Sequence, residues 1–162
     1  MKITIVKLGS MVGDFVSRTE GMLTHALLDL EMNIKYIYQP RGLNPETQQP
    51  VDRIWLERAR IVGDIEEVEV ELPVEVLGSK GTDIASGFKG TIVGIAYHIN
   101  GCVHLEIKPK GVLKKTGATI DTYDVDIRRV KGPAITALTE IQLNESIAER
   151  PSPMGMLKSN PK

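Results

Sequence analysis

The chain has 162 residues, enough for one ordinary domain or two very small ones, so a large multidomain enzyme is excluded. Its 20 lysine and arginine residues nearly balance 21 aspartate and glutamate residues, so no global field attracts nucleic acid or an anionic membrane. Aromatic residues are only 4% of the chain, whereas glycines number 15 and prolines 9. This composition favours an aliphatic core and many short strands.

The N-terminal segment, residues 1–16, is predicted to be neither an export signal nor a membrane span. Lys7 and Asp14 interrupt its apolar residues, and no apolar run approaches the roughly 20 residues of a membrane-spanning helix. Cys102 is a lone cysteine and has no partner for an internal disulfide. We expect a protein of a reducing compartment, without membrane association.

An internal repeat with a spacing of 69 residues organises the chain. Residues 8–63 align without a gap on residues 77–132 and share 12 identities with them, where about 3 are expected by chance. Each identity pairs a residue with the one 69 positions later: Leu8, Gly9, Ser10, Asp14, Ser17, Gly21, Pro40, Gly42, Thr47, Asp52, Arg60 and Gly63. The sequence therefore contains two copies of one small unit, here called the first copy (8–63) and the second copy (77–132).

Both copies are predicted to consist of strands. Apolar and polar residues alternate in residues 1–7, 34–38, 64–76 and 103–108, and branched residues are frequent in 90–97. Asn100-Gly101 is a strong signal for a tight hairpin, and a loop of about eight residues leads to a closing strand at 122–126. In residues 64–76 the alternation is between acidic and apolar side chains, which predicts a strand with one packed and one wet face.

This element order is typical of a five-stranded SH3-like barrel. The sequence thus predicts an all-β chain of two tandem SH3-like barrels. The first barrel is residues 1–63, and residues 64–132 are the acidic linking strand plus the second barrel. Residues 133–162 form a C-terminal segment that ends in a proline-rich arm, and periodicity leaves open whether 134–143 is helix or strand.

No catalytic or cofactor-binding set is predicted. The chain has no phosphate-binding loop of the Gly-x-x-x-x-Gly-Lys type, and no Ser-His-Asp or Cys-His arrangement is recognisable. Four aspartates could supply carboxylates for acid-base chemistry or Mg²⁺: Asp83, Asp121, Asp124 and Asp126. Asp83 and Asp121 have counterparts in the first copy beside turns, so turn geometry explains them better.

The histidines offer a weak metal hypothesis. His104 and Cys102 lie two apart and would face the same side of a strand, and His25 and His98 could join them. Paired Cys-x-x-Cys or His-x-x-x-His spacing is lacking. Cys102 is better explained as a small apolar residue, and the sequence assigns no metal site.

The second copy carries a group of basic residues and the first an aromatic group. The basic residues that could bind nucleic acid are Lys108, Lys110, Lys114, Lys115, Arg128 and Arg129. Few aromatic residues accompany them, so a solvated charged surface is the better interpretation. In the first copy Tyr36, Tyr38 and Trp55 could form a cage for a cation, although their alternation favours core packing.

Residues 77–130 contain a combination of motifs: Gly87-Phe88-Lys89-Gly90, then residues 97–102 (Tyr-His-Ile-Asn-Gly-Cys), then Lys108-Pro109-Lys110. In this combination the chain resembles small proteins of tailed bacteriophages with an SH3/KOW-like barrel. The resemblance implies a phage origin and a non-enzymatic role, with a place in the virion and in the host cytoplasm during assembly.

Three hypotheses follow. The first is a virion component that docks on capsid or tail subunits within an oligomeric assembly. Its arm would contact a neighbouring subunit through Arg150, Pro151, Pro153, Met154, Met156 and Leu157. The second is an adaptor or inhibitor that binds host protein or nucleic acid through the basic second copy. The third is a sponge for a small nucleotide.

Overall fold

The structure is a computed structural model that describes residues 1–136, and within them the repeat recurs element by element. The first copy contains β2 (Met11–Asp14), β3 (Glu20–Asp29), β4 (Ile34–Pro40), β5 (Ile54–Glu57), the 3-10 turn η1 (Arg58–Arg60) and β6 (Ile61–Val62). The second copy contains β8 (Lys80–Asp83), β9 (Lys89–His98), β10 (Val103–Lys108), β11 (Tyr123–Asp126), η3 (Ile127–Arg129) and β12 (Val130–Lys131). The equivalent elements begin and end 69 residues apart, except that β10 ends one residue before the counterpart of the end of β4.

Each copy is a row of five antiparallel strands bent around its own core. In the first copy the order is β6-β2-β3-β4-β5, and the second copy has β12-β8-β9-β10-β11. The all-β prediction is confirmed. Closed SH3-like barrels are not observed, because the two end strands of each row follow one another through a 3-10 turn and share no ladder among residues 1–136.

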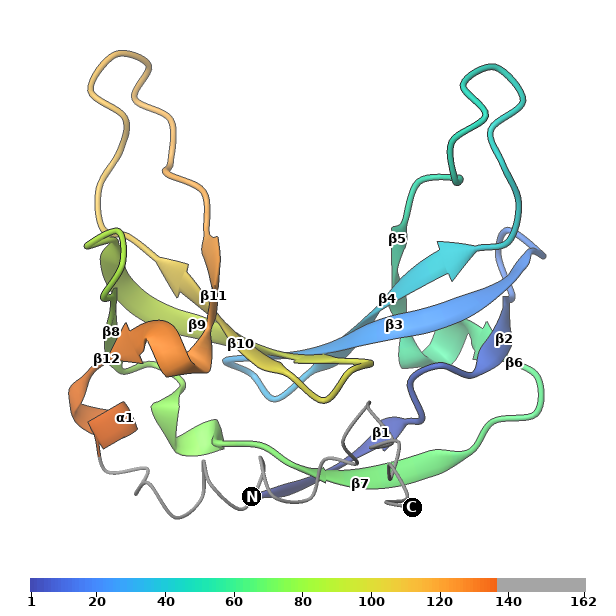
Figure 1. Cartoon of the computed structure of the whole chain (residues 1–162), viewed down its shortest axis with the longest axis horizontal. Helices are drawn as coiled ribbons and strands as arrows, with labels where there is room; N and C mark the ends of the chain where they lie inside the picture. Colours follow the sequence, from blue (N-terminus) through green and yellow to red (C-terminus); the bar gives the residue numbers. More distant parts are fainter. Residues whose placement is uncertain (137–162) are drawn as a thin grey trace, which may run out of the picture.

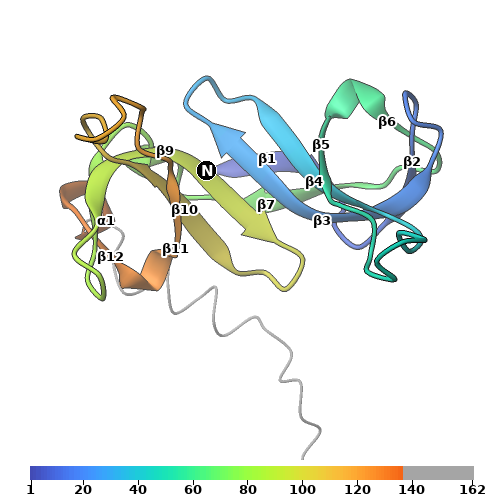
Figure 2. The same cartoon turned by 90° about the horizontal axis from the view of Figure 1, so that it is seen from above.

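The two rows join into one sheet through their longest strands. β3 pairs antiparallel with β9, from His25 opposite His98 to Asp29 opposite Gly94. Leu27 lies opposite its own repeat counterpart, Ala96, so the pairing has the symmetry of a two-fold axis at this point. Figure 2 shows β3 and β9 side by side, with their hairpins pointing in opposite directions.

A two-stranded ribbon lies beneath this sheet. It pairs β1 (Lys2–Val6) with β7 (Glu67–Glu71), and Figure 1 shows it on the side away from the two long loops. Val68 and Val70 pack on the cores while the glutamates of β7 are exposed, as the alternation in 64–76 predicts. The repeat does not extend to β1 as a strand. Its counterparts, residues 71–75, include Pro73 and part of the 3-10 turn η2 (Val74–Val76).

Residues of one copy complete the core of the other. Leu28 of the first copy belongs to the cluster that contains Ile95 and Leu105 of the second, and Tyr97 packs against both clusters. Ile5 and Val6 of β1 cover the first core. The predicted boundary near residue 63 therefore separates two copies of a sequence, but not two independent cores.

In each copy an ion pair with a buried carboxylate joins the 3-10 turn to the second strand of the row. Arg60 of η1 donates from Nε to Asp14 Oδ1 at 3.0 Å and from Nη2 to Oδ2 at 2.6 Å, and Ser17 Oγ donates to Asp14 Oδ2 at 2.6 Å. Arg129 and Ser86 hold Asp83 in the same way, with the corresponding distances of 3.2, 2.8 and 2.6 Å. The predicted turn role of Asp14 and Asp83 is thus confirmed.

These hydrogen bonds favour the ionised carboxylates. Those from Arg60 and Ser17 hold the pKa of Asp14 well below its ordinary value, although burial opposes them. The hydrogen bonds from Ser86 and Arg129 lower the pKa of Asp83 to about 2.

Beyond the repeat, the chain forms the short helix α1 (Pro133–Thr136), and Ile135 is buried in the second core. Of residues 134–143, for which the sequence left helix or strand open, residues 134–136 belong to a helix. The others lie outside the described residues. The proposed arm, with Arg150, Pro151, Pro153, Met154, Met156 and Leu157, lies outside the described residues. Among the residues that are described, no helix has the length and apolar character needed to cross a membrane.

Candidate functional site

One face of the joined sheet is turned away from both cores, and we call it the open face. It runs across six strands in the order β5-β4-β3-β9-β10-β11. On β3, Ala26 and Leu28 point into the cores, whereas the alternating His25 and Leu27 are only half-buried. The side chains of the open face are therefore available to a ligand or partner.

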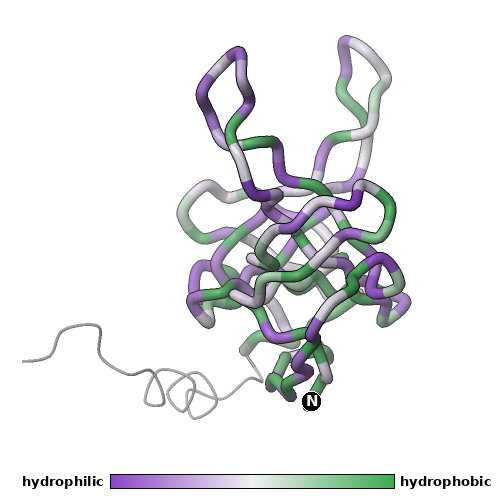
Figure 3. Tube along the Cα trace, turned by 90° about the vertical axis from the view of Figure 1, so that its right-hand side faces the viewer, coloured by the Kyte–Doolittle hydropathy of each residue, from purple (hydrophilic) through white to green (hydrophobic). Residues whose placement is uncertain are grey.

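Two equivalent loops flank the open face. The first loop (41–53) joins β4 to β5 and the second loop (110–122) joins β10 to β11, and both rise on the same side of the sheet (Figures 1 and 3). Each loop has its own backbone hydrogen bond, Asn44 N–H to Gln49 O at 2.8 Å and Leu113 N–H to Ala118 O at 2.8 Å. Each also has an isolated bridge, so the loops have a defined shape.

The loops present apolar side chains to solvent. The side chains are 58% exposed at Leu43 and 54% at its counterpart Val112, and Val51 and Leu113 are exposed as well. The charges of the loops differ. Residues 41–53 contain two basic and two acidic residues, whereas 110–122 contain three basic and one acidic, so the net charges are 0 and +2.

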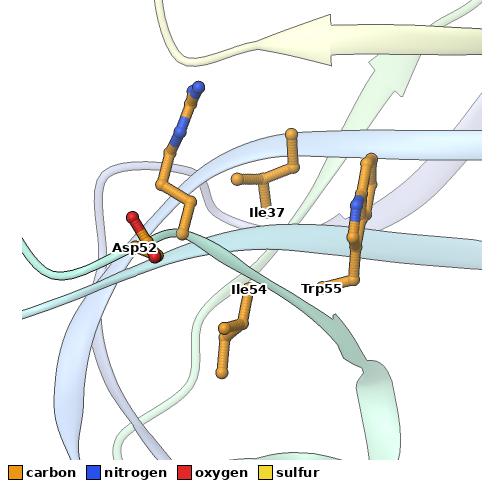
Figure 4. Close-up of a pocket in the computed structure, with 5 residues that line it drawn as sticks. Ile37, Asp52, Ile54 and Trp55 are labelled. Atoms are coloured by element: carbon orange, nitrogen blue, oxygen red, sulfur yellow. The ribbon is translucent and has the colours of Figure 1, made fainter.

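A shallow groove of about 480 Å³ lies at the base of the first loop (Figure 4). Its lining is Ile37, Asp52, Arg53, Ile54 and Trp55. Trp55 is 50% exposed, so the prediction that it packs in the core is wrong, whereas Tyr36 and Tyr38 are fully buried core residues. The three aromatic residues form no cage, because Trp55 points to the opposite face of the sheet from the two tyrosines.

All three histidines of the chain meet on the open face, where the two copies join. The ring centroid of His98 is 4.1 Å from that of His25 and 4.2 Å from that of His104. His104 Nδ1 lies 3.1 Å from Asp124 Oδ2. We call these four residues the histidine cluster.

Two imidazoles of the histidine cluster, those of His25 and His98, favour their neutral forms. Burial lowers the pKa of His98 to about 4, and the neighbouring His25 and His104 add to this effect. Burial and the charge of Arg53 lower the pKa of His25. Neutral imidazole is the form that can accept a hydrogen bond or bind a metal ion.

The sequence indicated the histidines as candidate ligands, but it did not predict how they are arranged. His25 and His98 come together only through the pairing of β3 with β9, which no local pattern indicates. Asp124 joins them from β11, whereas Cys102 is absent from the set of metal-binding atoms that the described residues bring together. Alternation within each strand could have placed His98, His104 and Asp124 on one face, but not next to His25.

The predicted basic residues do not form one free patch. Arg128 pairs with Asp126, and Arg129 pairs with Asp83. The four exposed lysines lie at the end of β10 and in the second loop: Lys108, Lys110, Lys114 and Lys115. Asp121, also in this loop, is exposed and separate from the histidine cluster.

Comparison with known proteins gives no match to a protein family model, to a curated protein or to a solved structure.

Proposed function

We propose that the chain is a non-enzymatic structural protein of a phage particle, which docks on capsid or tail subunits through its two loops and open face. The observation that carries this proposal is the pair of equivalent, internally bonded loops on one side of the sheet. Exposed apolar side chains on shaped loops are typical of surfaces that bind other proteins.

Two loops related by a two-fold axis suit a partner that offers two equivalent surfaces. Once one loop has bound, the second binds as an intramolecular step, so the combined affinity exceeds that of either loop. The C-terminal arm is proposed as a further contact with a neighbouring subunit.

Charged substitutions at equivalent exposed positions of the two loops test the docking proposal. The double variant Leu43→Asp/Val112→Asp should reduce incorporation into particles at least tenfold, because it places a carboxylate in each apolar contact. Its melting temperature should stay within about 2 °C of the wild type, since both side chains are exposed. Incorporation is measured by quantitative mass spectrometry of purified particles.

Phe15→Asp is the matched control. Phe15 is 70% exposed on the turn between β2 and β3 and belongs to neither loop, so this variant should be incorporated normally. Normal incorporation of the double loop variant would contradict docking through the loops.

In the same assay, a chain that ends at Glu149 should be incorporated less, and unchanged occupancy would reject the arm.

A second candidate function is nucleic-acid binding by the second loop, which its charge of +2 favours. Lys110, Lys114 and Lys115 are exposed there. In that case a gel shift should weaken steeply with salt and should disappear in the Lys114→Glu/Lys115→Glu variant. A nucleotide sponge would instead show saturable binding to a nucleotide panel in calorimetry.

A further inference from the structure

The histidine cluster breaks the symmetry of an otherwise regular molecule. In the first copy, the positions of His98, His104 and Asp124 are occupied by Asp29, Lys35 and Trp55. The first copy builds the same strands and turns with these other side chains. The fold therefore does not require two imidazoles and a carboxylate at this place, and their presence needs another explanation.

The geometry is close to that of a metal site. His98, His104 and Asp124 each provide one metal-binding atom, and these three atoms lie within 4.8 Å of one another. Ligand atoms at about 2.1 Å from a tetrahedral zinc ion are about 3.4 Å apart. Metal binding therefore requires these atoms to move closer together, and rotation of the side chains about their own bonds can provide this.

One imidazole nitrogen of the histidine cluster is buried and makes no hydrogen bond among the described residues. His98 Nε2 has no hydrogen-bond partner among residues 1–136, although buried polar atoms are nearly always satisfied. A buried nitrogen beside a second imidazole and a carboxylate is placed to bind a cation.

We propose that the histidine cluster binds one divalent transition metal ion of the zinc type, with His98, His104 and Asp124 as protein ligands. His25, in edge-to-face contact with His98 from the other copy, is placed to orient the His98 ring. Imidazole with carboxylate suits zinc and its neighbours rather than Mg²⁺. The ion would link β9, β10 and β11 at the edge of the seam with β3.

Zinc titration of the untagged, full-length chain tests this proposal. Calorimetry should show one saturable site for Zn²⁺ and none for Mg²⁺. At 100 times the Kd, zinc should raise the melting temperature by roughly 5–10 °C, because it binds the folded state. In the wild type, addition of zinc should shift the imidazole ¹⁵N resonances of His98 and His104.

Two ligand variants and one control locate the ion. His104→Ala and Asp124→Asn should each raise the Kd for zinc at least tenfold, whereas Asp121→Asn, a carboxylate variant three residues away, should leave it unchanged. No saturable binding by the wild type, unshifted imidazole resonances, or full affinity in a His98→Ala/His104→Ala variant would overturn the proposal. The resonance test uses the wild type and does not depend on whether a variant folds.

Discussion

Replacing Asp14 with alanine is expected to lower the melting temperature by roughly 10 °C. The Asp14 side chain is fully buried and accepts hydrogen bonds from Arg60, Ser17 and Val16. Alanine removes the acceptor of these hydrogen bonds and with it the ion pair that joins η1 to β2. Thermal unfolding followed by circular dichroism measures the effect.

Asp52→Ala is the control for this variant. Asp52 is also identical in both copies, but it is exposed, so its loss should change the melting temperature by less than about 2 °C. If the Asp14→Ala protein melts within 2 °C of the wild type, the ion pair is not a main support of the fold.

The same carboxylates make stability depend on pH in the acid range. The pKa values of Asp14 and Asp83 are lower in the folded protein than their ordinary value of 3.8. Their contribution is therefore complete above about pH 5 and is lost as the pH falls toward about 2. Urea unfolding at pH 6, 4 and 3 should show a shallower loss for Asp14→Asn/Asp83→Asn than for the wild type, and equal slopes would contradict this assignment.

The second large effect is expected at Gly90. A Cβ atom at this position would lie 2.2 Å from the carbonyl oxygen of Lys108 on the neighbouring strand β10. Because this atom belongs to the backbone, Gly90→Val must push β9 and β10 apart. We expect the free energy of unfolding to fall by roughly 4 kcal/mol, measured by urea denaturation.

The neighbouring Lys89→Ala variant is the control, because Lys89 is exposed on the same strand. It should unfold within about 0.5 kcal/mol of the wild type. A folded Gly90→Val protein of wild-type stability would show that the two strands are farther apart than described here.

Several of the identities that reveal the repeat have a physical reason in the structure. Gly21 and Gly90 sit where a neighbouring backbone leaves no room for a Cβ atom, at 2.3 and 2.2 Å from a carbonyl oxygen. Asp14 and Arg60 form an ion pair, and the Ser17 hydroxyl donates to the same buried carboxylate. The shape of the strands and turns permits few other residues at these positions. The spacing of the identities between the two copies could therefore predict those strands and turns.

The joining of the two copies could not be predicted in this way. The pairing of β3 with β9 and of β1 with β7 depends on which strand edges meet, and alternation in a strand does not specify its partner. The histidine cluster depends on this pairing, because His25 reaches His98 only across the seam. The proposed ligands His98, His104 and Asp124 all belong to the second copy, so strand alternation could indicate them, whereas their contact with His25 could not be predicted.

The turns show a further limit of sequence patterns. Arg18, Met32 and Gln48 have positive φ values of 57°, 66° and 58°, and each stands where the second copy has glycine. The backbone shape is thus retained in the first copy without the residue that signals it. This explains why Asn100-Gly101 predicts a hairpin clearly, whereas Glu31-Met32 at the same place does not.

Mass spectrometry of purified phage particles tests the proposed virion role most directly. We predict that each particle contains the chain, in a fixed ratio to the number of copies of a capsid or tail protein. Its absence from particles, with the chain abundant in the infected cell, would contradict a structural role in the virion.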